Sequence, residues 1–321
     1  MREFSNEVEA ADALKEVAQT LKKEISKVIV GQHDVVDSVL LSIFCNGHSL
    51  LVGVPGLAKT LLIKTISDVL DMSFQRIQFT PDLMPTDITG SEILDDNRKF
   101  RFSKGPLFAN IILADEINRT PPKTQAALLE AMQEKNVTVN GQEHKLPKPF
   151  FVLATQNPIE QEGTYPLPEA QLDRFMFNII LDYPSEADEI EIVRSTTSNA
   201  VANISKVLDA NDILQFQKLV REVPIADNVL EYAVKLVGRT RPGADGASEY
   251  VKKYLNYGAG PRASQYLVLG AKCHALMNGK YSPDIENVQA IATNVLRHRV
   301  VKNYRAEAEG ISVEDIIKHL M

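Results

Sequence analysis

One eight-residue loop, Gly53-Val-Pro-Gly-Leu-Ala-Lys59-Thr60, constrains this chain more than any other segment. It follows the short apolar run 49–52, which is typical of a buried strand, and it precedes residues 60–70, which have helical periodicity. Glycines let a chain wrap around a phosphate, where successive backbone N–H groups and a helix N-terminus bind the anion. The order strand, loop, helix therefore predicts a site for nucleotide phosphates, with Lys59 at the β and γ phosphates and the Thr60 hydroxyl on Mg²⁺.

The loop departs from the usual pattern at one position, because alanine stands where a glycine normally precedes the lysine. We expect the loop to keep its shape provided that Ala58 keeps a negative φ, since alanine is the smallest replacement. The residues expected to bind the phosphates are Gly53, Val54, Pro55, Gly56, Leu57, Ala58, Lys59, Thr60 and Leu61.

A second motif, Asp115-Glu116, follows the apolar run 111–114. Ligands of open α/β sheets bind at the carboxyl ends of the strands, where this pair would lie. An acidic pair after a strand is by itself only weak evidence, and an ordinary surface pair would be the simpler interpretation. Together with the phosphate loop it predicts phosphoryl transfer to water, in which Asp115 holds Mg²⁺ through water and Glu116 polarises the attacking water.

Apolar runs at 74–79, 150–154 and 176–181 predict further strands, so the first part of the chain is expected to form a three-layer α/β core around a parallel sheet. Two hairpins are expected within it, near 80–107 around Asp95-Asp96-Asn97 and near 137–146 around Asn140-Gly141. After Pro184 every predicted element is a helix, including 284–303. We therefore predict an α/β domain over residues 1–184 and an all-helical lid over 185–321, with the nucleotide between them.

Three further polar residues are candidates for the same chemistry. Asn157 follows the strand 150–154, and a position of that strand between the other two motif strands would bring its amide to the γ-phosphate. An Asn-Pro turn is the alternative. Arg174 lies in a short helix before the last strand, and Arg262 opens a helix of the lid. For Arg174 the alternative is an ion pair with nearby acidic residues, and for Arg262 it is a solvated side chain.

Six motifs together resemble one known family. They occur in the order Gly31-Gln32, GVPGLAKT (53–60), LADEINR (113–119), ATQNP (154–158), LPEAQLDRF (167–175) and GPRAS (260–264). This order, which spans essentially the whole chain, is similar to that of AAA+ ATPases of the MoxR family, close to the ATPase subunits of magnesium chelatase. MoxR-like sequences commonly share the alanine before the lysine.

The resemblance implies a role for each candidate. Val30, Gly31 and Gln32 would border the adenine of ATP, with Lys59 and Thr60 as the Walker A pair and Asp115 and Glu116 as the Walker B pair. Asn157 would be sensor 1, Arg262 the sensor 2 arginine, and Arg174 the arginine finger of a neighbouring subunit, with Arg119 as the alternative finger. The two hairpins match insertions of this clade.

The same resemblance implies an ATPase ring, most often hexameric. Its role would be chaperone-like: it would remodel or activate partner proteins, often ones with a von Willebrand factor A domain, or assist metal insertion. A slow nucleotide-gated scaffold is one alternative, and a nucleic-acid motor is a second. The net charge of −7 and the lack of a basic, aromatic stretch make nucleic acid an improbable partner.

Three features that the sequence lacks indicate where in the cell the protein is located. The first ten residues lack the apolar core of a secretory signal, and the most apolar stretch, Ser38 to Ala58, is interrupted by polar residues and glycines, so no membrane span is expected. Cys45 and Cys273 lack metal-ligand spacing and are expected to be reduced thiols. We therefore expect a cytoplasmic protein.

Overall fold

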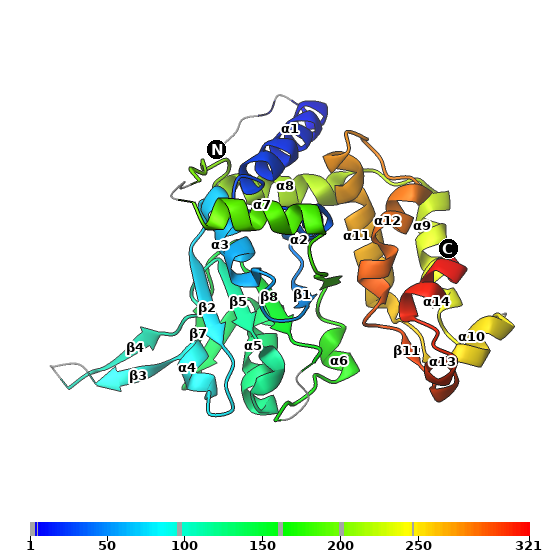
Figure 1. Cartoon of the computed structure of the whole chain (residues 1–321). Coiled ribbons are helices and arrows are strands. Elements are labelled where there is room, and N and C mark those ends of the chain that lie inside the picture. The colour runs from blue at the N-terminus through cyan, green and yellow to red at the C-terminus, as the bar shows by residue number, and fades with distance from the viewer. Residues whose placement is uncertain (1–3, 5, 95–97, 160–162, 199–201, 246) are drawn as a thin grey trace.

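A parallel sheet of five strands forms the centre of the molecule (Figure 1). The computed structural model describes residues 4, 6–94, 98–159, 163–198, 202–245 and 247–321. Across the sheet the order is β2 (Phe74–Gln78), β5 (Ile111–Asp115), β8 (Phe151–Gln156), β1 (Ser49–Val52) and β9 (Phe177–Ile180). The predicted parallel sheet is confirmed, and β8 lies between β1 and β5, as the expectation for Asn157 required.

Alternate residues of the central strands enter two separate apolar cores. Leu51 packs in the core that contains helices α1 (Glu7–Ile25), α2 (His33–Phe44) and α3 (Lys59–Val69). Leu50, its neighbour in β1, packs in the core on the other face, which contains α5 (Pro122–Glu134). A strand buried on both faces reads as a continuous apolar run, and the predicted three-layer α/β arrangement is confirmed.

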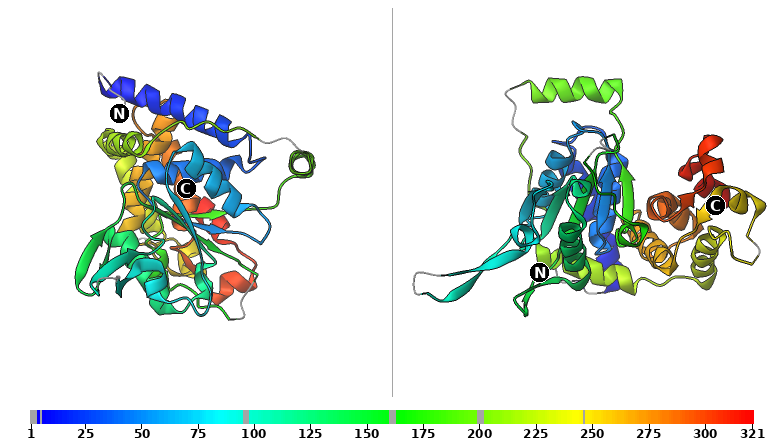
Figure 2. Two further views of the ribbon diagram at one scale, coloured as in Figure 1. Left: turned by 90° about the vertical axis from the view of Figure 1, so that its left-hand side faces the viewer. Right: turned by 90° about the horizontal axis from the view of Figure 1, so that it is seen from below.

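Both predicted hairpins are present. The β3 (Gly90–Leu94) and β4 (Phe100–Lys104) hairpin follows the short helix α4 (Pro85–Thr89) and projects from the body of the molecule (Figures 1 and 2). Asp95, Asp96 and Asn97 lie outside the described residues. The second hairpin joins β6 (Asn136–Val139) to β7 (Gln142–Lys145). Asn140 and Gly141 have φ values of 48° and 79°, as the predicted type I′ turn requires.

After β9 the chain is mostly helical, and its C-terminal helices form a lid beside the sheet (Figure 1). The longer helices of this part are α7 (Glu186–Thr196), α8 (Ala210–Glu222), α9 (Asp227–Arg239), α11 (Pro261–Met277), α12 (Ile285–Leu296) and α14 (Val313–Leu320). The short helices are α10 (Glu249–Tyr254) and α13 (Tyr304–Ala308). The prediction that every element here is a helix is wrong at one short antiparallel pair, in which β10 (Leu255–Tyr257) pairs with β11 (Val301–Lys302). Helix α7 has no buried residue and stands apart from the body in both views of Figure 2.

The helix predicted over 284–303 is wrong in its second half, because α12 ends at Leu296. There the chain turns, and residues 297–299 direct their side chains to the segment that precedes and enters β9. Polar contacts from these three side chains to the backbone near β9 thus take the place of the predicted second half of the helix.

One apolar core connects the two parts of the chain. Helices of the N-terminal part, α1 and α2, share it with α8, α11 and α12. The side-chain amide of Gln217 in α8 also donates to the carbonyl of Ile43 in α2, at 2.9 Å. The lid is therefore packed directly on the face of the sheet that carries α1 to α3.

Candidate functional site

The phosphate loop connects β1 to α3, which begins at Lys59. Two of its residues adopt the left-handed conformation, Gly56 with φ of 90° and Ala58 with φ of 54°. The expectation that Ala58 keeps a negative φ is therefore wrong. Alanine at positive φ places its Cβ close to the following carbonyl and costs about 1 kcal/mol, so the loop tolerates strain at the position where glycine is usual.

Lys59 folds back into this loop. Its ammonium donates to the carbonyl oxygens of Gly53 at 2.5 Å and Val54 at 3.3 Å. Burial lowers the pKa of Lys59, while the charges of Asp115 and Glu116 act against that shift. The acidic pair is thus close enough to act on the Lys59 charge, and the two motifs predicted to share a site do converge.

Asp115 is buried at the carboxyl end of β5. One carboxylate oxygen accepts from the Thr155 hydroxyl at 2.6 Å, and the other accepts from Arg76 Nε and Nη2 at 2.9 and 2.6 Å. Mg²⁺ prefers hard oxygen ligands and keeps several waters. The Asp115 carboxylate and the Thr60 hydroxyl, one residue after Lys59, supply such oxygens, so the donor set fits a Mg²⁺ ion.

Glu116 follows directly and is held in a left-handed conformation with φ of 57°. Its backbone N–H donates to the Thr155 hydroxyl at 2.8 Å. Its carboxylate accepts from Gln78 Nε2 at 2.7 Å and from Arg119 Nη1 at 3.0 Å. These contacts fix both the backbone and the carboxylate of Glu116 at the edge of the sheet from which the phosphate loop leaves β1.

Sequence reasoning missed three members of this site: Arg76, Gln78 and Thr155. Arg76 and Gln78 alternate on β2, so their side chains share one face of the strand, and each binds one member of the acidic pair. Polar residues at alternate positions of a strand beside the acidic strand are the signal that could have indicated them. Thr155 lies near the end of β8, where it bridges Asp115 and Glu116.

Asn157 is buried directly after β8. Because β8 lies between β1 and β5, its carboxyl end opens beside both the phosphate loop and the acidic pair. The Asn157 side-chain oxygen accepts from the Ile159 N–H at 3.1 Å. The turn interpretation of Asn-Pro is therefore also satisfied, and this contact uses the side-chain oxygen and not the amide nitrogen.

The segment predicted to border adenine is attached to the phosphate loop. The side-chain nitrogen of Gln32 donates to the carbonyl of Leu57 at 3.3 Å, and the side-chain oxygen is buried without a hydrogen-bond partner among the described residues. Val30 precedes Gly31, which has φ of 66°. A Cβ on Gly31 would lie 3.1 Å from the carboxylate of Asp188, so the first turn of α7 lies close to this segment.

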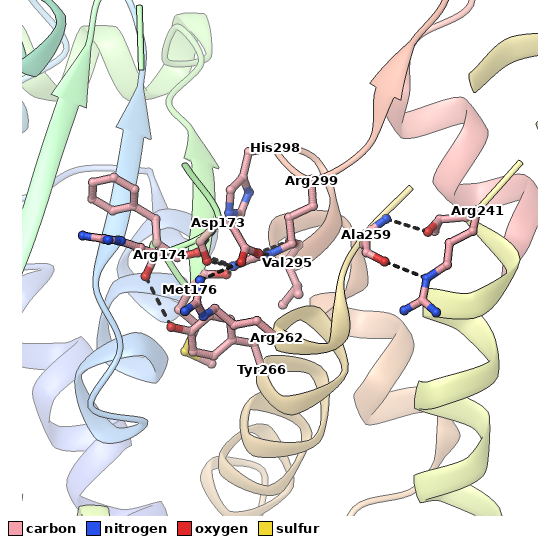
Figure 3. Close-up of polar contacts among 12 residues, drawn as sticks. Asp173, Arg174, Met176, Arg241, Ala259, Arg262, Tyr266, Val295, His298 and Arg299 are labelled. Atoms are coloured by element: carbon pink, nitrogen blue, oxygen red, sulfur yellow. Dashed lines mark hydrogen bonds and ion pairs between the residues drawn. The ribbon is translucent and has the colours of Figure 1, made fainter. Parts of the chain in front are cut away.

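Arg174 and Arg262 form a second group, joined by Asp173 (Figure 3). Arg174 comes after the short helix α6 (Glu169–Leu172), and Arg262 is the second residue of α11. Arg262 Nη1 is 2.7 Å from the Asp173 carboxylate, and the Tyr266 hydroxyl donates to the Arg174 carbonyl at 3.3 Å. The structure thus places Arg262 near the backbone of Arg174 and directs the Arg174 guanidinium away from it, whereas the hydrogen bonds of Lys59 are to the phosphate loop.

A lysine in a strand–loop–helix turn, an acidic pair on a nearby parallel strand and a helical lid define an ATPase of the AAA+ class. Residues 48–177 match the family described as "ATPase family associated with various cellular activities (AAA)", and residues 247–320 match the "AAA lid domain".

Individual relatives narrow the family. The chain is 42% identical over 316 residues to Chaperone MoxR1 of Mycobacterium tuberculosis, which covers 97% of this chain and 83% of that protein. It is 40% identical over 301 residues to the uncharacterized YeaC protein of Bacillus subtilis, with 93% and 91% covered. A crystal structure of a candidate ATPase from Cytophaga hutchinsonii matches with a TM-score of 0.91 at 43% identity, covering 97% and 95%. The chain therefore belongs to the MoxR family of AAA+ ATPases, and the resemblance is confirmed.

Proposed function

We propose that this ATPase hydrolyses ATP with Mg²⁺ in a ring of identical subunits, and that hydrolysis drives the remodelling or activation of a partner protein. The observation that carries the proposal is the convergence of Lys59, Asp115 and Glu116 at the carboxyl edge of one sheet, with Asn157 directly after the strand between them. We further propose residues 1–184 as the nucleotide-binding domain and 185–321 as the lid, with the nucleotide bound between them.

Each residue of the site has a separate task in this proposal. Lys59 neutralises the β and γ phosphates, and Thr60 and Asp115 hold Mg²⁺, which supplies charge neutralisation on the phosphate oxygens. Glu116 orients the attacking water, and the Asn157 amide contacts the γ-phosphate. Arg76 donates to the same Asp115 carboxylate and would share it with the Mg²⁺ ion.

Arg174 is proposed to act on the nucleotide of a neighbouring subunit, together with Arg262 beside it. The alternative finger, Arg119, bonds to Glu116 of its own chain at 3.0 Å. That contact gives Arg119 a role within its own site, and it favours Arg174 as the residue presented to the neighbour. Hexamers are the most frequent form of such rings, so we propose six subunits.

The two hairpins are proposed to contact the partner protein. They are joined to each other: the Phe102 ring stacks on His144 with 3.8 Å between centroids, and Asn140 Nδ2 donates to Glu92 at 2.7 Å. The β3–β4 arm also exposes the side chains of Leu94 and Phe100. A paired, projecting and partly apolar surface suits protein contact. A von Willebrand factor A domain protein, or a protein that receives a metal, is the proposed client.

We also propose a cytoplasmic location. Cys45 and Cys273 are buried free thiols, as expected of a chain in a reducing compartment. Within the described ranges, none of the helices has both the length and the apolar character needed to cross a bilayer.

A subunit-mixing experiment tests the proposal. ATP turnover is measured with Mg²⁺ and with excess EDTA for wild type, Lys59→Ala, Arg174→Ala and a mixture of the two variants. We expect turnover to require Mg²⁺, and Arg174→Ala to lower it by about 10³-fold while nucleotide affinity stays within about twofold, because the finger acts only in the transition state.

The mixture of the two variants should recover part of the activity, since some sites then combine an intact Lys59 with an intact neighbouring Arg174. No recovery in mixtures that co-assemble would show that Arg174 acts within its own chain. Wild-type turnover below about once per minute that is unchanged by assembly would instead support a slow scaffold, and strong stimulation by DNA would support a nucleic-acid motor.

A further inference from the structure

We propose that Asp173, Tyr266 and Arg299 are positioning residues for Arg174, and that through them the lid sets where the Arg174 guanidinium is presented. The inference rests on the proposed action of Arg174 on a neighbouring nucleotide. It assigns a function to the segment Arg297-His298-Arg299, which leaves α12 and turns toward the strand domain.

The three side chains of this segment all contact residues 173–178. Arg299 is buried, and its guanidinium donates to the carbonyls of Asp173 at 2.7 Å, Phe175 at 2.6 Å and Met176 at 3.2 Å. His298 Nε2 lies 3.0 Å from the Phe175 carbonyl. Arg297 Nη1 donates to the Asn178 carbonyl at 2.7 Å. Lid side chains therefore bind the backbone on both sides of Arg174.

Asp173 is the centre of the cluster, because its two carboxylate oxygens bind two different arginines (Figure 3). One oxygen is 2.7 Å from Arg299 Nε, and the other is 2.7 Å from Arg262 Nη1. The Arg299 side chain is 2% exposed and that of Arg262 is 41% exposed. The buried arginine thus forms the permanent contact, whereas Arg262 can leave Asp173 for another anion without opening the core.

Tyr266 completes the support from α11. Its hydroxyl donates to the Arg174 carbonyl, and its ring lies 5.1 Å from the Arg299 guanidinium in a cation–π contact. Burial raises the pKa of Tyr266, so the hydroxyl remains a donor. The backbone of Arg174 is therefore held at its carbonyl by the lid and at its N–H by the Gln171 carbonyl, at 3.2 Å.

The side chain of Arg174 contrasts with its fixed backbone. Among the described residues, its guanidinium makes no hydrogen bond or ion pair, and Figure 3 shows it directed away from the Asp173 cluster. Arg76, Arg262 and Arg299 are all paired with carboxylates. A fixed backbone and a free guanidinium are what a group needs to bind charge on another subunit. A displacement of the lid would shift Arg174 and Arg262 together, because both are linked to Asp173.

Asp173→Asn is the test variant, since it keeps the size of the side chain but removes the charge between the two arginines. Glu309→Gln is the matched control. Like Asp173, Glu309 is a carboxylate between two basic side chains, Lys253 at 3.2 Å and Arg305 at 2.8 Å, but both of its partners belong to the lid. The measurements are kcat and nucleotide affinity of the assembled protein with MgATP, and amide hydrogen exchange of a peptide covering residues 172–178.

We expect Asp173→Asn to lower kcat by about 10²-fold, as a displaced catalytic group does, and to leave nucleotide affinity within about twofold. Exchange over 172–178 should be faster in Asp173→Asn and unchanged in Glu309→Gln, which should keep wild-type kcat. In an Arg174→Ala background, Asp173→Asn should lower kcat no further, because the group that it positions is already absent.

Tyr266→Phe is the milder variant if Asp173→Asn does not fold. It removes one hydrogen bond to Arg174 and should lower kcat about fivefold, again without effect in the Arg174→Ala background. Additive losses, or wild-type kcat and exchange in these variants, would overturn the positioning role even if Arg174→Ala is impaired. If Arg174→Ala itself keeps full turnover, the finger assignment fails first, and the positioning role fails with it.

Discussion

Replacing Lys135 with methionine is expected to stabilise the fold at neutral pH. Lys135 ends α5 at the base of the β6–β7 hairpin, and burial lowers its pKa from 10.5 to about 8. Its ammonium lies 2.8 Å from His48 Nε2 and 3.5 Å from the Phe150 carbonyl. No carboxylate forms an ion pair with Lys135 in the described part of the chain, and the Phe150 carbonyl and ring, with its centroid 5.6 Å away, offset only part of the cost of burying the charge.

The tautomer of His48 supports this pKa shift. The Val152 N–H donates to His48 Nδ1 at 2.9 Å, so Nδ1 carries no proton and Nε2 carries it in the neutral ring. Burial and the neighbouring Lys135 keep the pKa of His48 well below its ordinary value. The Nε2–H of His48 then faces two groups, the Met132 carbonyl at 3.1 Å and the Lys135 nitrogen. The carbonyl can always accept this hydrogen, whereas the Lys135 nitrogen can accept it only when the amine is uncharged.

The magnitude follows from linkage. At about 1.4 kcal/mol per pKa unit, a pKa lowered from 10.5 to about 8 means that the charged form of Lys135 destabilises the fold by about 3 kcal/mol below pH 8. Between pH 8 and 10.5 the unfolded chain binds a proton that the folded chain has released. The free energy of unfolding of the wild type therefore rises with pH across this window, and Lys135→Met lacks that rise.

Urea unfolding of both proteins at several pH values from 7 to 10.5 measures the effect. Lys135→Met should be more stable by up to about 3 kcal/mol at pH 7, and the difference should vanish toward pH 10.5. The control Lys145→Met, at an exposed position of β7, should stay within about 0.5 kcal/mol of wild type. A Lys135→Met protein that is less stable at pH 7, or whose difference does not change with pH, would refute the reasoning.

Two further predictions concern the phosphate loop and the second hairpin. Ala58→Gly should raise the free energy of unfolding by about 0.5 to 1 kcal/mol, because glycine adopts φ of 54° without strain, and lower stability in urea unfolding would contradict this. Replacing Thr138–Glu143 with a short glycine-serine turn, while keeping the buried Val137, should preserve basal ATPase and assembly but abolish stimulation by a partner that co-purifies with Glu116→Gln. Unchanged stimulation would make this hairpin purely structural.

Much of the site could be predicted because its motifs are local in sequence. Lys59 and Thr60 belong to one continuous strand–loop–helix segment, and Asp115 and Glu116 end one apolar strand. Within each motif the residues that act together are adjacent in the sequence, so the motif can be identified without knowing the fold. The position of Asn157 depended on the order of the strands in the sheet. The order is the expected one, with β8 between β1 and β5.

Other features depend on contacts between distant segments, which periodicity does not reveal. Arg76 binds Asp115 only because β2 pairs with β5 in one particular register. Arg299 lies in the segment predicted as the helix 284–303, and that pattern does not reveal the carbonyls and the carboxylate of the Asp173 segment that make its burial possible. The positive φ of Ala58 was missed because its small side chain suggested an ordinary backbone, whereas the loop imposes a left-handed one.

Separate measurement of ATP binding and ATP hydrolysis tests the central claim most directly. Lys59→Ala should lose tight binding of MgATP, because it removes the side-chain cation against the phosphates. Glu116→Gln should bind MgATP with an affinity within about twofold of wild type but hydrolyse it about 10² to 10⁴ times more slowly, since only the orientation of water is lost. Equal loss of binding and hydrolysis in Glu116→Gln, or wild-type binding by Lys59→Ala, would contradict the account.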